Sequence, residues 1–204
     1  MLDYRRGNAF AIPWEEGLLR ALILLLLCGI LPGATLKYWV QPCEHPGTIC
    51  QAGDPELAQW AVESWQKASN GHLTLQKTED RVKVHIRIVW ATGNSSLYGE
   101  ARPIFVDGVR GAEVYVLPAP ADAAGSDTLM RETILYLTCL HETGHALGLP
   151  HTAKFADIMY SFQYGGDIPE YFGRYRTQLK SRADIRQHSG MSADDRKVLL
   201  EIYQ

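Results

Sequence analysis

Residues 141–151, which read HETGHALGLPH, decide the fold. His141 and His145 are four residues apart, so on a helix their imidazoles share one face about 6 Å apart, a separation at which both can bind one zinc ion. Gly148 can take the positive φ angle that ends a helix and turns the chain back, which lets His151 reach the same ion. The segment therefore predicts a helix that ends in a metal site with three histidine ligands.

This metal site is predicted to be catalytic, because three protein ligands leave the fourth zinc position open to water. Zinc lowers the pKa of that water toward ~7, and Glu142 is placed to take its proton so that a hydroxide can attack a carbonyl. The alternative is that three histidines are ordinary polar groups at a helix end. A chance match rarely combines three His, a Glu and a Gly at the end of a capped helix, so the catalytic interpretation is favoured.

The chain on either side of this motif predicts alternating strands and helices. Asp127 is a suitable N-cap for a helix over about 128–147 that carries the motif. Alternation over 81–90, with Val82 and Val84 on the apolar side, predicts a half-buried strand. Other predicted elements are strands at 36–40, 101–106 and 113–117, a helix starting at Asp54-Pro55, and a C-terminal helix capped by Ser192.

Composition limits the class of protein. The 204 residues are 46% hydrophobic and 21% charged, with a formal net charge of -3, which describes one domain large enough to bury a core. No basic stripe is present, so a nucleic-acid partner is not expected. Four cysteines are too few for a scaffold built from disulfides. We predict a monomer.

Residues 1–33 have the layout of a secretory signal peptide. Arg5, Arg6 and Arg20 precede an apolar run at 21–31, which Pro32-Gly33 ends. The run is shorter than the ~20 residues of a bilayer span, so we predict cleavage near Gly33, no stable membrane span, and a secreted or extracytoplasmic protein. The alternative is an uncleaved anchor at 18–31 on a tethered interaction protein.

An oxidising compartment makes a small local disulfide between Cys43 and Cys50 plausible, because both lie in one loop. Cys139, two residues before His141, is predicted to be a buried free thiol.

The motif HETGHALGLPH, followed by Asp157-Ile158-Met159-Tyr160, resembles the signature and Met-turn of metzincin zinc peptidases. Within that class it is most similar to the matrixins, since Thr152 follows the third ligand and a helix begins after Met191-Ser192-Ala193-Asp194-Asp195. The resemblance implies an α/β (α+β) metzincin fold with a twisted mixed sheet and two long helices. An upper subdomain (34–148) and a lower one with one helix (149–204) would enclose the substrate cleft.

The resemblance also implies roles for individual residues. His141, His145 and His151 would be the ligands, Glu142 the general base and Met159 the apolar floor beneath the zinc. Ser161, Phe162 and Tyr164 would form a wall of the S1′ pocket, and Leu137 would help to set its depth and favour apolar P1′ side chains. An extended peptide would pair with an exposed sheet edge near residues 101–105.

Two departures from the family are visible. Matrixins usually bind a structural zinc and calcium before the active-site helix, yet residues 91–117 contain no His and only Glu100, Asp107 and Glu113 as acids. We therefore predict one catalytic zinc and no structural zinc, while calcium is possible but unsupported. The segment 165–190 is longer than the family needs and is predicted to be a solvated helical excursion, with a role in shaping the cleft as the alternative.

These observations together predict a secreted zinc-dependent endopeptidase that acts on peptide or protein substrates. The alternative is an exported protein that binds zinc and peptides without hydrolysing them. Glu142 argues against that alternative, because a binding module needs no general base beside the metal.

Overall fold

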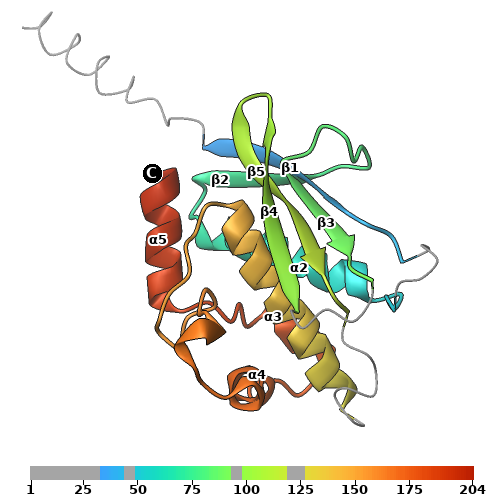
Figure 1. Cartoon of the computed structure of the whole chain (residues 1–204), viewed down its shortest axis with the longest axis vertical. Helices are drawn as coiled ribbons and strands as arrows, with labels where there is room; N and C mark the ends of the chain where they lie inside the picture. Colours follow the sequence, from blue (N-terminus) through green and yellow to red (C-terminus); the bar gives the residue numbers. More distant parts are fainter. Residues whose placement is uncertain (1–32, 44–48, 93–97, 119–126) are drawn as a thin grey trace, which may run out of the picture. The chain divides into compact units, whose positions relative to one another are not determined.

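The computed structural model describes residues 33–43, 49–92, 98–118 and 127–204. Its centre is a five-stranded sheet with the strand order β2-β1-β3-β5-β4 (Figure 1). The strands are β1 (Ala34–Val40), β2 (Leu73–Lys77), β3 (Ile86–Trp90), β4 (Gly99–Val106) and β5 (Val109–Val116). All neighbouring pairs are parallel except β4 and β5, which are antiparallel. The strand β4 therefore forms one edge of the sheet.

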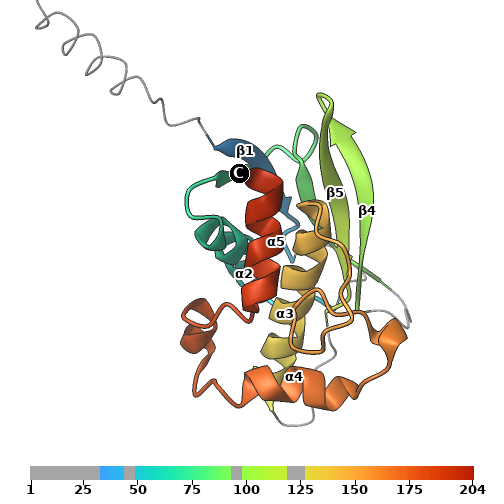
Figure 2. The same ribbon diagram turned by 90° about the vertical axis from the view of Figure 1, so that its left-hand side faces the viewer.

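Two long helices, α2 (Asp54–Ala68) and α3 (Thr128–Ala146), pack against each other and cover one face of the sheet (Figure 2). Alternate residues of β3 and β5, such as Ile88 and Val114, are buried beneath them. The Trp65 side chain of α2 is fully buried and its indole N–H donates to the Leu140 carbonyl at 2.9 Å. Apolar burial on this face is the main force that holds α3 in place.

The opposite face of the sheet is polar. Arg87 on β3 pairs with Glu113 on β5 across the strands, at 3.0 Å between Nη1 and Oε1. One buried and one solvated face produce the alternating pattern that the sequence carries in β3. The predicted α/β class with a mixed sheet and two long helices is confirmed.

A buried ion pair joins the two long helices. The two terminal guanidinium nitrogens of Arg131 on α3 each lie 2.7 Å from one carboxylate oxygen of Asp54, the first residue of α2. The Asp54 carboxylate also accepts from the Gln51 N–H at 2.8 Å. Removing either partner would leave a buried charge unpaired, so this pair specifies the relative position of α2 and α3.

Two strand predictions were wrong at their starts, and one strand was missed. The strand predicted from residue 113 begins at Val109. The strand predicted from residue 81 begins at Ile86, and Val82 is 70% exposed, because residues 81 and 82 alternate without pairing to another strand. The strand β2 was not predicted. Only Leu73 and Leu75 of its five residues are buried, so its apolar signal is weak, and parallel pairing with β1 stabilises it.

The segment after residue 165 is not a solvated excursion, and that prediction was wrong. It contains the helix α4 (Ile168–Arg176) and a 3-10 turn at Arg182–Arg186. Tyr171, Phe172 and Tyr175 of α4 are buried, which helical spacing allows because they lie on one face. Arg176 at the end of α4 contacts Asp127, the N-cap of α3, with Nε 3.0 Å from Oδ2. This ion pair holds α4 against the start of α3. Residues 149–204 contain two α-helices, α4 and α5 (Ala193–Tyr203), so the prediction of one helix in this part was wrong.

Cys43 and Cys50 are joined by a disulfide, and Cys139 is a buried free thiol. Burial raises the pKa of the Cys139 thiol, which keeps it protonated and unreactive. The predicted signal segment 1–33 lies outside the described residues except for Gly33, so it stays a prediction. In the described part of the chain, no helix has the length and apolar character needed to cross a membrane.

Candidate active site

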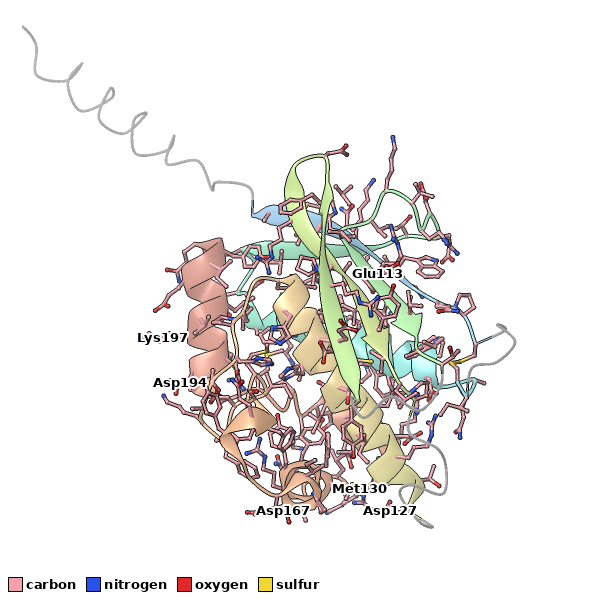
Figure 3. The ribbon with its side chains drawn as sticks, viewed as in Figure 1. Glu113, Asp127, Met130, Asp167, Asp194 and Lys197 are labelled. Carbon is pink, nitrogen blue, oxygen red and sulfur yellow. A yellow bond between two sulfur atoms is a disulfide. The ribbon has the colours of Figure 1, made fainter. Side chains whose placement is uncertain are left out.

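The first part of the site is the carboxyl-terminal end of α3. The Asp127 side chain caps the start of this helix by accepting from the Met130 N–H at 3.0 Å, as predicted. Asp127 and Asp167, the N-caps of α3 and α4, lie at the same end of the domain (Figure 3). The helix ends after Ala146, and Gly148 has a φ angle of 98°, so the predicted positive-φ turn is confirmed. The turn returns the chain toward the helix.

The turn brings three imidazoles together. His151 Nε2 lies 3.2 Å from His141 Nε2 and 3.0 Å from His145 Nε2. His141 Nδ1 donates to the Ile158 carbonyl at 2.7 Å and His145 Nδ1 donates to the Leu149 carbonyl at 2.9 Å. Because each Nδ1 carries the proton, the two Nε2 lone pairs point into the same small space.

The spacing of these nitrogens fits a bound zinc ion. Tetrahedral zinc with Zn–N distances of 2.0–2.1 Å separates its ligand nitrogens by about 3.3 Å. Lone pairs at this separation repel one another unless a cation lies between them. Burial lowers the pKa of His141 to about 4 and also lowers the pKa values of His145 and His151, which favours the neutral, ligand-ready imidazoles.

Glu142 lies beside this histidine cluster and is held against the edge strand. Its carboxylate accepts a hydrogen bond from the Ala101 N–H of β4. Burial, with the nearby charge of Glu100, raises the pKa of Glu142 to about 7. Gly99 leaves the space for this contact, because a Cβ there would lie 2.6 Å from Glu142 Cγ. The carboxyl group is thus positioned in the cleft by contacts that the sequence did not reveal.

Met159 is 1% exposed and packs against Gly144 of α3. A Cβ at Gly144 would lie 2.4 Å from Met159 Sδ, so only glycine allows this approach. The Asp195 carboxylate accepts from the Ile158 N–H at 2.8 Å and the Met159 N–H at 3.3 Å. Ser192, the predicted N-cap of α5 (Ala193–Tyr203), also donates its N–H to Asp195. The helix α5 therefore fixes the turn that contains Met159.

A cavity of about 550 Å³ opens next to the histidine cluster. Of the residues predicted for the substrate pocket, Leu137, Ser161 and Phe162 line this cavity. Tyr164 does not line it and is 57% exposed, because the 3-10 turn at Phe162–Tyr164 ends at Gly165, whose φ angle is 93°. The predicted wall is therefore formed by the first part of that segment.

The alternative prediction for segment 165–190, a role in shaping the cleft, agrees with the structure, because α4 lines the cavity. Four further residues of the wall were not predicted individually. They are Tyr98, before β4, and Ile168, Tyr171 and Phe172 on α4. The Tyr98 and Phe172 rings meet edge to face with centroids 5.4 Å apart, and so close one end of the cavity. The apolar spacing 168, 171, 172, 175 was the signal that could have identified α4 as a packed helix.

Only one other group of three candidate metal-binding side chains occurs in the described ranges. It consists of Cys43, Cys50 and Asp54, and its two sulfurs are bonded to each other. The predictions about structural zinc and calcium stay predictions.

Two histidines and a glutamate on one helix, with a third histidine after the turn that follows, lie beneath the edge of a mixed sheet, and this is the site of the metzincin class of zinc metallopeptidases. The family model for Matrixin matches residues 34–170, and the chain belongs to the matrixin family. A solved structure titled "Structure of myroilysin" is 15% identical to this chain, covers 84% of this chain and 93% of that chain, and has a TM-score of 0.42. No curated protein matches the sequence.

Proposed function

We propose that this protein is an exported zinc endopeptidase in which His141, His145 and His151 hold the metal and Glu142 is the general base. The observation that carries the proposal is the convergence of three Nε2 atoms beside a carboxyl group in one cleft. Bound zinc would supply Lewis-acid polarisation of a carbonyl and acidification of a water molecule.

Glu142 performs the proton transfers in this scheme. Its carboxylate accepts a proton from the attacking water, and the same group then donates that proton to the leaving amine as the peptide C–N bond breaks. The raised pKa, about 7, is suited to a group that must both accept and donate near neutral pH. The hydrogen bond from Ala101 keeps the carboxyl at the edge strand, where the substrate main chain is expected.

The substrate in this proposal is an extended peptide that adds to the free edge of β4. One side chain enters the apolar cavity formed by Leu137, Phe162 and Phe172, which is the S1′ pocket of the proposed enzyme. An apolar P1′ residue is favoured, since the cavity buries apolar surface and no Lys or Arg of the described residues lines it. The disulfide between Cys43 and Cys50 agrees with folding in an oxidising compartment.

The test is cleavage of an unbiased peptide library by the purified protein, with Glu142→Ala and a zinc-stripped sample run in parallel. We expect Glu142→Ala to retain one zinc per chain and to lose about 10²- to 10⁴-fold in turnover, the contribution of general-base catalysis. Glu201→Ala, an exposed carboxylate on α5, is the matched control and should leave turnover unchanged.

Wild-type turnover in Glu142→Ala would exclude this carboxylate as the base. Zinc binding without cleavage of any peptide by the wild type would indicate a peptide-binding protein that lacks the reaction.

A further inference from the structure

The hydrogen-bond pattern of β5 shows which main-chain groups of β4 face the free edge. The Ala112 N–H donates to the His85 carbonyl at 2.8 Å, and the Val116 carbonyl accepts from the Ala91 N–H at 2.7 Å. Both residues therefore direct their main-chain groups toward β3 and away from β4. Their partners in the antiparallel register are Pro103 and Gly99, which must face away from β5.

Two contacts of β4 itself agree with this assignment. The Tyr98 carbonyl accepts from the Leu117 N–H at 2.9 Å, so Tyr98 faces β5. The Ala101 N–H bonds to the Glu142 carboxylate, so Ala101 faces the cleft. Since facing alternates along a strand, residues 99, 101 and 103 share the free edge.

The free edge thus contains a proline where a main-chain donor would stand. Proline has no N–H, and it is tolerated in β4 because that donor is not needed for pairing with β5. Pro103 is two residues, about 7 Å, beyond Ala101 on the side away from Tyr98. Tyr98 and Gly99 line the apolar cavity, so Pro103 lies on the other side of the reaction centre.

We infer that Pro103 weakens main-chain recognition of the substrate at this position, because it offers no N–H to the peptide bound there. This inference rests on the proposed function. A peptide strand normally exchanges two hydrogen bonds with every second residue of an edge. Opposite Pro103 it can donate to a carbonyl but finds no donor for its own carbonyl.

A proline at a sheet edge has another established effect, which is to prevent pairing with other chains. That effect does not depend on substrate. The two effects can be distinguished by measuring how much each substrate carbonyl contributes to kcat/KM with and without an N–H at residue 103.

The experiment uses zinc-loaded full-length protein and peptides that share one cleavage site. Each carbonyl on the amino-terminal side of that site is replaced in turn by a thiocarbonyl, which weakens one hydrogen-bond acceptor and keeps the neighbouring N–H, and kcat/KM is measured for wild type and Pro103→Ala. In the wild type we expect replacement of the carbonyl opposite residue 103 to lower kcat/KM less than twofold. In Pro103→Ala the same replacement should cost about 2- to 12-fold, the net effect of one hydrogen bond.

Pro103→Thr should behave as Pro103→Ala does, because both restore the main-chain donor. Ile104→Ala is the matched control, since the main chain at 104 faces β5. In this variant each carbonyl replacement should lower kcat/KM as much as it does in the wild type. Thermal unfolding and bound zinc verify that each variant is folded.

The inference is overturned if each carbonyl replacement lowers kcat/KM equally in Pro103→Ala and in wild type. It is also overturned if replacing the carbonyl opposite residue 103 already lowers kcat/KM of the wild type more than twofold. Absence of zinc-dependent cleavage of every unmodified peptide would instead defeat the proposed function.

Discussion

The histidine cluster and the apolar cavity adjoin each other in one cleft, yet they are encoded in different ways. The cluster comes from eleven consecutive residues on one helix and one turn. The cavity wall comes from β4, α3, the segment after Met159, and α4, which are spread over residues 98–172. The residues of the proposed reaction are therefore close together in the sequence, whereas the shape of the substrate cavity depends on how distant segments pack. Substitutions in the two regions should therefore have different consequences.

The largest effect is expected inside the cluster. His145→Ala should lose both bound zinc and detectable turnover, because two histidines cannot hold the metal in a three-ligand site. Metal analysis and peptide turnover measure this, and added zinc should restore a chelated wild type but not the variant. His188→Ala, an exposed histidine outside the cluster, is the control. Undiminished turnover in His145→Ala would contradict the ligand assignment.

An intermediate effect is expected in the cavity wall. Phe172→Leu removes the ring that meets Tyr98 and so lengthens the cavity. The ratio of kcat/KM values for large over small apolar P1′ residues should rise about tenfold, with bound zinc unchanged. Phe105→Ala is the control, since Phe105 is 73% exposed and does not line the cavity. An unchanged ratio would mean that α4 does not limit the pocket.

The smallest effect is expected at Gly144, where α3 meets the turn that contains Met159. Gly144→Ala should lower the free energy of unfolding by about 1 kcal/mol, because the clash with Met159 Sδ exceeds the gain in helix propensity. Gly173→Ala is the matched control in α4, where an added Cβ has no neighbour within 4 Å, and it should be stabilising by up to about 1 kcal/mol. Chemical denaturation measures the free energy of unfolding of both variants. Equal changes in Gly144→Ala and Gly173→Ala would show that no clash with Met159 occurs.

The accuracy of the sequence predictions follows the strength of local signals. The helix α3 was predicted within about one residue, because Asp127 caps it and Gly148 ends it. The strand β2 was missed because parallel pairing with β1 across α2 stabilises it, and no local pattern reports such a pairing. Residues 81 and 82 alternate like a strand but lack a partner, so periodicity alone misplaced the start of β3.

The helix α4 shows the same limit at the site. The segment was predicted to be solvated, yet the Arg174 guanidinium on α4 lies over the Phe155 and Tyr171 rings. Arg176 pairs with Asp127, while Tyr171 and Phe172 turn inward to the cavity. Net charge is a property of the whole segment, whereas burial depends on which face meets another element.

The sequence by itself determined the metal-binding pattern, because helical spacing and one glycine are local properties of eleven residues. The class of fold was predicted from the resemblance of this motif and of residues 157–160 to the metzincins. Only the tertiary structure decided that Ala101 and Gly99 hold Glu142, that Asp195 fixes the Met159 turn, and that Tyr98 and Phe172 close the cavity. These contacts join residues 36 to 74 positions apart, and the packing of whole elements, not any local preference, brings such residues together.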